Sequence, residues 1–179
     1  MARTTFQGPV RSLGGIYQQG PATVVEVTAS TTLDPVAHAG RIISVGGSLA
    51  ANVVLTLPSI NVSTNSITSG PGQDPNTVNN EGVVYTIWVP TTISTSSLKI
   101  GTNGTDKYVG SLLSVDTDSS GAVVGFTAAS TNDFINLNGT TTGGVAGTWI
   151  QIVAIAANKY MVTGVVNGSG SVATPFADS

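Results

Sequence analysis

The chain has no cysteine among its 179 residues, one histidine and only 8% charged residues. The missing cysteine excludes disulfides and thiolate metal sites. Six Lys and Arg in a chain of net charge −3 make no basic face, so we expect no sequence-independent binding to nucleic acid. The longest apolar run, residues 149–157, is far shorter than the roughly 20 residues of a membrane span, and the chain opens without the apolar stretch of a secretory leader. We therefore expect no membrane segment.

The composition favours β structure. Val, Ile and Thr together number 60, whereas the good helix formers Leu, Met, Glu, Gln, Lys and Arg together number 24. Short β-rich runs are separated by clusters of Gly, Asn, Pro, Ser and Thr, a pattern typical of a β-sandwich or barrel. The predicted strands are residues 23–29, 41–45, 52–57, 83–89, 107–115, 122–127, 134–137, 148–156 and 159–166.

The pattern divides the chain into an extended N-terminal arm, residues 1–22, and a single β domain, residues 23–179. The arm has few apolar side chains, so they pack on the chain's own body or on another subunit, unless the segment is a frayed terminus. In the run 148–156 apolar and polar residues do not alternate, which predicts a central strand shielded on both faces. Asn158 tolerates the positive φ of a tight turn, so this run and 159–166 are predicted to form a hairpin. Residues 61–82 are predicted to form a long surface loop.

The residues that could carry catalysis are few. His38 is the only imidazole, and no Gly-x-Ser-x-Gly motif surrounds any serine, so a serine-hydrolase triad is poorly supported. A lone histidine also cannot build the usual zinc site. Glu26 and Glu81 are candidates for the carboxyl pair of a glycosidase, but each fits a solvated acid on or beside a strand better. We expect neither an enzyme nor a cofactor.

Two further motifs are better explained as turns. Residues 116–121 (Asp-Thr-Asp-Ser-Ser-Gly) resemble the start of a calcium loop, but Thr127 stands where the bidentate Glu belongs. This segment is predicted to be a turn between two strands, with a weak ion site as the alternative. Sequons begin at Asn61, Asn103, Asn138 and Asn167. The last three are Asn-Gly pairs, which favour turn chemistry over glycosylation.

A family resemblance is carried by the arm and the C-terminal part. Residues 6–12 (Phe-Gln-Gly-Pro-Val-Arg-Ser) and 14–16 (Gly-Gly-Ile) resemble the N-terminal segment of head decoration (cement) proteins of tailed phages, especially short-tailed phages including cyanophages. Residues 132–139, 143–144, 147–150, 168–170 and 173–176 resemble the closing strands of their β-barrel or jelly-roll domains. The resemblance implies an all-β fold in which an extended N-terminal arm precedes a jelly-roll or Greek-key β-sandwich or barrel.

The resemblance also implies a function. Such a protein is a homotrimer on the outer surface of the virion capsid, made in the host cytoplasm, that clamps neighbouring copies of the major capsid protein and stabilises the expanded shell. An extended arm suits this role because it can add a strand or fill a groove. The expected arm anchors are Phe6, Val10, Ile16 and Tyr17, with Arg3 and Arg11 as partners of capsid carboxylates. The uncharged polar surface would then face outward.

The alternative is a carbohydrate- or receptor-binding module of a phage fibre or capsid knob, and a weak glycan contact is compatible with either function. Sugar recognition commonly uses an aromatic platform, for which the candidates are Tyr85, Trp88, Tyr108 and Trp149. All four lie in predicted strands, where core packing is the simpler role. A glycan-degrading phage enzyme is a third hypothesis. Exposure of these aromatic side chains discriminates between a platform and a core.

Overall fold

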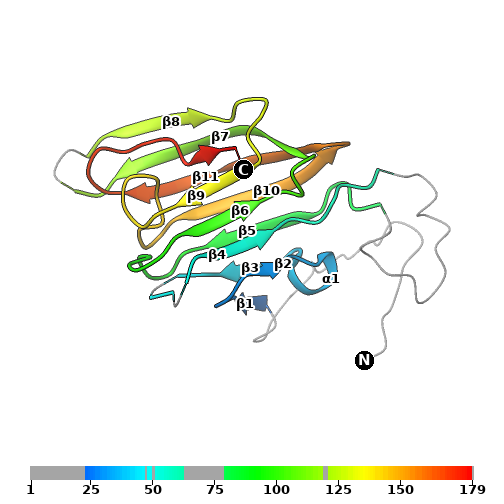
Figure 1. Cartoon of the computed structure of the whole chain (residues 1–179), viewed down its shortest axis with the longest axis horizontal. Coiled ribbons are helices and arrows are strands. Elements are labelled where there is room, and N and C mark those ends of the chain that lie inside the picture. The colour runs from blue at the N-terminus through cyan, green and yellow to red at the C-terminus, as the bar shows by residue number, and fades with distance from the viewer. Residues whose placement is uncertain (1–22, 47, 50, 63–78, 119–120, 179) are drawn as a thin grey trace, which may run out of the picture.

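The computed structural model describes residues 23–46, 48–49, 51–62, 79–118 and 121–178 (Figure 1). Strands predominate in these residues, and the all-β sandwich predicted from the sequence is confirmed. The predicted arm contacts Arg3, Phe6, Val10, Arg11, Ile16 and Tyr17 lie outside the described residues. Most of the predicted loop 61–82 lies outside them as well.

The strands form two sheets, which we call sheet A and sheet B. Sheet A has seven strands in the spatial order β1 (Val24–Glu26), β3 (Ile42–Ser44), β5 (Val84–Trp88), β10 (Trp149–Ala156), β11 (Lys159–Gly168), β7 (Lys107–Asp116) and β8 (Val123–Thr127). Sheet B has five strands in the order β12 (Phe176–Ala177), β9 (Phe134–Leu137), β6 (Leu98–Gly101), β4 (Val53–Thr56) and β2 (Thr31–Thr32). All nine predicted strands are present, and β2, β6 and β12 were not predicted.

From β1 to β7 the chain alternates between the two sheets. This alternation explains why successive strands of one sheet pair parallel in the first half of the chain. Parallel neighbours need a crossover connection, usually a helix. Here a strand of the opposite sheet provides it: the chain leaves β1, passes through β2 in sheet B and returns to β3. As a result β1, β3 and β5 are parallel neighbours in sheet A, and β2, β4 and β6 are parallel neighbours in sheet B.

The last four strands are closer to the jelly-roll pattern expected from the sequence, although β11 also pairs parallel with β7. β10 and β11 pair antiparallel in sheet A, while the flanking strands β9 and β12 pair antiparallel in sheet B. The chain therefore passes from β9 in sheet B to the hairpin β10–β11 in sheet A, and returns to sheet B at β12 beside β9. A jelly roll is antiparallel throughout, so the parallel coil of the first half departs from the jelly-roll or Greek-key topology that the resemblance implied.

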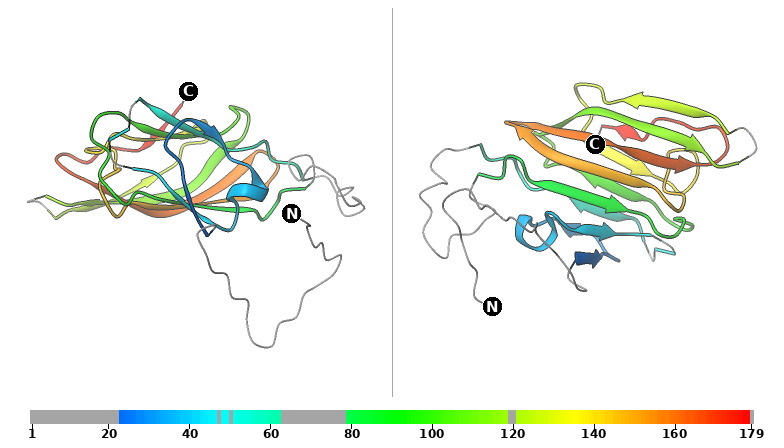
Figure 2. Two further views of the ribbon diagram at one scale, coloured as in Figure 1. Left: turned by 90° about the horizontal axis from the view of Figure 1, so that it is seen from below. Right: turned by 180° about the vertical axis from the view of Figure 1, so that it is seen from behind.

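The two sheets pack face to face as stacked layers (Figure 2), and the core lies between them. Sheet A contributes Tyr85, Ile87, Leu112, Ile150 and Ile152, and sheet B contributes Leu55, Leu98, Ile100, Ile135 and Leu137. All ten side chains are at most 1% exposed. Burial of side chains this large is worth about 1.5–3 kcal/mol each, so the sandwich is stabilised mainly by this layer.

The turns behave largely as predicted. Asn158 has a φ of 60° in the hairpin between β10 and β11. Asp116 closes the turn between the antiparallel strands β7 and β8, because its Oδ1 accepts the N–H of Asp118 at 3.0 Å. Thr127 lies in β8, where its hydroxyl is 3.0 Å from that of Ser111. Residues 119–120 lie outside the described residues, and the rest of this segment connects the antiparallel strands β7 and β8, as predicted for a turn.

The asparagines of the sequons differ in their surroundings. Asn103 Oδ1 accepts from the N–H groups of Thr105 and Asp106, and Asn138 Oδ1 accepts from that of Thr140, so both side chains stabilise turns as predicted. Asn167 instead lies in β11, and the turn predicted there is wrong. Its Nδ2 donates to Ala146 O at 2.8 Å and ties β11 to the segment before β10.

Among the described residues, no helix is long and apolar enough to cross a membrane. α1 (Pro35–His38) has four residues.

Candidate binding surface

His38 has a structural role in α1. Its ring Nδ1 accepts the backbone N–H of Asp34 at 2.9 Å, and the side chain is only 9% exposed. Asp34 is the N-cap of the same helix, and its carboxylate accepts from the N–H groups of Val36 and Ala37. The histidine therefore stabilises the short helix to which it belongs, by a hydrogen bond to the residue at the start of that helix.

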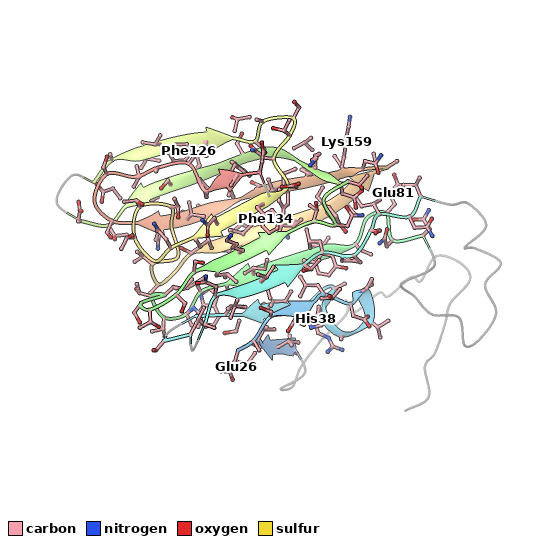
Figure 3. The ribbon with its side chains drawn as sticks, viewed as in Figure 1. Glu26, His38, Glu81, Phe126, Phe134 and Lys159 are labelled. Atoms are coloured by element: carbon pink, nitrogen blue, oxygen red, sulfur yellow. The ribbon has the colours of Figure 1, made fainter. Side chains whose placement is uncertain are left out.

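The two glutamates considered for glycoside hydrolysis are not a pair. Glu26 is on the edge strand β1, whereas Glu81 is in the turn before β5, and Figure 3 shows them well apart. Both side chains are exposed, as predicted for solvated acids. A glycosidase needs its two carboxyl groups across one cleft, about 5–10 Å apart, and these residues do not provide that geometry.

The four aromatic candidates divide into two kinds. Tyr85 and Tyr108 are completely buried in the core, where burial raises the pKa of each phenol above its ordinary value. Trp88 and Trp149 are each 39% exposed. Core packing is therefore confirmed for the tyrosines, whereas the tryptophans lie on the face of sheet A that points away from sheet B. We call this face the outer face of sheet A.

Strand register places the tryptophans side by side. Trp88 on β5 is opposite Trp149 on β10. The neighbouring pair carries the backbone hydrogen bond from Val89 N to Thr148 O, so the tryptophans occupy a non-hydrogen-bonded position. Side chains approach most closely at such positions, with Cα atoms about 4.5 Å apart. The two exposed indoles thus occupy directly opposed positions on the outer face of sheet A.

The same register continues this site as an apolar row. Trp149 is opposite Val165 on β11, and Val165 is opposite Leu113 on β7, which is 49% exposed. A second apolar row, two outward-facing positions further along the strands, contains Val84, Val153, Met161 and Val109. Between the two rows lies a polar, uncharged row of Thr86, Gln151, Thr163 and Ser111. The outer face of sheet A therefore combines apolar contact area with hydrogen-bonding groups.

Among the described residues, charged side chains lie only at the margins of this face. Glu26 lies on the edge strand β1, and Lys107 and Lys159 are paired at the first residues of β7 and β11. Lys107 is neutralised by Asp133, whose Oδ2 is 2.8 Å from its Nζ. An uncharged face this broad suits contact with another macromolecule, because large exposed apolar patches on folded proteins mark interaction sites.

The described carboxylates with the least exposure support loops instead. Asp106 is 1% exposed, and its Oδ2 accepts the N–H of Ile60 at 3.0 Å. Burial raises the pKa of Asp106, and the hydrogen bond from Ile60 offsets part of this effect. Nearby, Asn80 bonds to Ser59 and Asn61, which holds together the two ends of the segment 61–80. This cluster fastens one end of the sandwich.

The sequence analysis misjudged one strand and so missed most of this face. β10 is central, as predicted, being fourth of seven strands, but it is not shielded on both faces. Trp149 and Ile155 are exposed by 39% and 38%. Weak alternation in β10 does not reflect burial on both sides; it reflects an outer face that is itself apolar. The signal was available in Met161 and Leu113, two large apolar residues at outward positions of their strands.

Comparison of the chain with protein-family models, with curated proteins and with solved structures gives no match.

Proposed function

We propose that the chain is a structural decoration (cement) protein that binds the outer surface of a phage head and, as a homotrimer, clamps neighbouring copies of the major capsid protein. The observation that carries the proposal is the outer face of sheet A, with its uncharged apolar rows. Trp88 and Trp149 have the character of binding anchors, because tryptophan is enriched among the few residues that dominate interface energetics. The sequence resemblance of the arm supports the same partner.

In this proposal the chain binds and does not catalyse. The face turned to the shell is the outer face of sheet A, because its exposed indoles gain more from a protein partner than from solvent. Val24 and Ile42, exposed by 44% and 38%, bring the face to the edge at which the arm enters β1. Arm and face can then act together, and their linkage raises the effective concentration of the second contact.

Stabilisation follows from preferential binding. If the protein binds only the expanded shell, it shifts the equilibrium toward that state by mass action. Heads that lack the protein should then lose their DNA sooner on heating or osmotic shock than complete heads. Equal resistance of the two kinds of head would contradict the stabilising role.

Co-sedimentation with purified empty heads tests the proposal. The full chain should pellet with heads, a chain without residues 1–20 should not, and the Trp88→Ala/Trp149→Ala variant should bind roughly 30-fold more weakly, as expected for the loss of about 2 kcal/mol. Lys99→Ala, on the outward face of sheet B, is the matched control and should bind normally. Full binding by the double tryptophan variant would exclude the outer face of sheet A as the contact.

A second candidate function is a carbohydrate- or receptor-binding module, and the exposed Trp88–Trp149 pair specifically favours it. The polar row beside the indoles, with Thr86 and Gln151, could donate to and accept from sugar hydroxyls. Retention of the protein on immobilised neutral polysaccharides tests this candidate. Trp88→Ala should abolish retention and Trp88→Phe should keep most of it, because a phenyl ring still offers a stacking face. A protein that is retained on none of them is not a module of this kind.

A further inference from the structure

The strands at the edges of the two sheets are unequal. An edge strand presents unpaired N–H and C=O groups, and natural proteins keep such strands short or give them charges, proline or bulges. β2 and β12 have two residues each, and β1 has three and carries Glu26. β8 has five residues, Val123–Thr127, and no charge or proline occurs from Gly121 to Asn132. β8 lacks every protection that the other edges have.

The side chains of β8 are also unusually exposed. Val123 is 62% exposed, the highest value among the large hydrophobic residues that the structure describes, and Val124 is 37% exposed. These two residues point to opposite faces of the sheet, so solvent reaches both sides of the strand. An uncharged apolar edge of this kind predicts pairing with another strand.

The hydrogen bonds to β7 determine which groups of β8 are free to pair. Asp116 N donates to Ala122 O, and Ala128 N donates to Gly110 O. Because hydrogen-bonded positions alternate along an antiparallel pair, the backbone groups of Ala122, Val124, Phe126 and Ala128 face β7. Those of Val123, Gly125 and Thr127 point outward, and the described residues place no strand beyond them.

We propose that β8 pairs antiparallel with β8 of a second copy of this chain, with Gly125 opposite Gly125 at the two-fold axis. In this register Val123 is opposite Thr127, so each residue whose backbone groups point away from β7 meets another such residue. Six backbone hydrogen bonds then form, two for each hydrogen-bonded position. Val124 is opposite Phe126, a combination of β-branched and aromatic residues that favours pairing. No like charges oppose each other within the paired strands.

The pairing would extend the proposed binding surface. A two-fold axis perpendicular to the sheet keeps the outer faces of both copies on one side, so the two seven-stranded sheets form one continuous sheet. Gly125 lies opposite Leu113, in the same row as Trp149 and Trp88. The apolar row of one copy therefore continues through the axis into that of the other. The proposal is independent of the identity of the partner bound by that face.

Substitutions at residue 125 test the register directly. Among the described residues outside its immediate chain neighbours, a Cβ at Gly125 would have only Leu113 Cδ2 within 4 Å, at 3.8 Å. The φ of Gly125 is outside the left-handed region, so side chains fit in the isolated copy. The wild-type chain should have twice the monomer mass by light scattering, 2 × 18.0 = 36 kDa. If the expected threefold association also forms through other surfaces, the particle holds six copies, 6 × 18.0 = 108 kDa. Gly125→Ala is the matched control and should keep the wild-type mass.

Gly125→Lys should halve the mass, because two ammonium groups would face each other at the axis, and Gly125→Glu should do the same. An equimolar mixture of these two variants should recover the wild-type mass as a mixed pair. Circular dichroism and denaturant unfolding of each variant report whether its sandwich is intact. A wild-type mass that is an odd multiple of 18.0 kDa, an unchanged mass for either charged variant, or a mixture that stays apart would overturn the pairing.

Discussion

At the scale of single residues, Gly139 shows how a loop constrains its sequence. It has a φ of 77°, and a Cβ there would lie 1.8 Å from the backbone oxygen of Ile93. Gly139→Ala should therefore destabilise the fold by about 3 kcal/mol or more, as denaturant unfolding would show. Gly104 is the control, because its φ is 86° but no atom of the described part of the chain lies within 4 Å of a Cβ there. Gly104→Ala should cost only about 1–2 kcal/mol; equal losses would mean that the contact with Ile93 is unimportant.

Asp106 gives a pH-dependent prediction. Burial raises the pKa of its carboxyl above the ordinary value of 3.8. The folded state therefore holds the proton more tightly than the unfolded state, so the contribution of Asp106 to stability is fully present below that ordinary value and is lost as the pH rises through the raised pKa. In Asp106→Asn the amide oxygen can still accept the N–H of Ile60, and no charge is buried. The stability of this variant relative to wild type, measured by urea unfolding at several pH values, should increase from pH 3.8 upward; a decrease would contradict the raised pKa.

At the scale of elements, β10 has both buried and exposed side chains. Ile152 is fully buried between the sheets, whereas Ile155, at the irregularity between Ala154 and Ala156, is 38% exposed. The same substitution can be made at both positions. Ile152→Ala should cost roughly 2–5 kcal/mol of unfolding free energy, and Ile155→Ala less than about 1 kcal/mol. A comparable loss at both positions would mean that β10 is shielded on both sides after all.

Strands were predictable wherever a run was long enough to carry a pattern. β10 and β11 have eight and ten residues, and Asn158 between them marks the turn, so the hairpin could be predicted from local chemistry alone. β2 and β12 have two residues each, too few for any alternation. β6 reads Leu-Lys-Ile-Gly, a single alternation next to a glycine whose space is filled by the ring of Phe134. Such strands exist because neighbours in the sheet hold them.

At the scale of the whole molecule, pairing between distant segments limits what a sequence reveals. The exposed site needs Trp88 and Trp149 on adjacent strands, and the strands containing them are separated by about 60 residues of sequence. Nothing local to either tryptophan says that the other is its neighbour. The parallel coil of the first half could not be predicted for the same reason. The sequence pattern of each strand indicates a strand, but it does not indicate that the chain crosses to the opposite sheet before the next strand. Candidate aromatic residues could be predicted, but their arrangement required the fold.

The last prediction concerns the contributions of the N-terminal arm and of the C-terminal residues to stability. The described hydrophobic core runs from Val27 to Phe176, so removal of residues 1–20 takes no member of it away. The shortened chain should unfold within about 0.5 kcal/mol of the full chain, as expected for changes outside a core. Removal of residues 175–179 is the contrasting truncation, because it deletes Phe176, which is 6% exposed and has its ring 6.4 Å from that of Tyr108.

Loss of a buried aromatic side chain should cost about 3–5 kcal/mol, so the C-terminal truncation should be far less stable than the N-terminal one. A strong loss of stability on removal of residues 1–20 would mean that Phe6, Val10, Ile16 and Tyr17 pack on the chain's own body. Those side chains would then no longer be available as anchors on a shell, and head binding would have to rest on the outer face of sheet A alone.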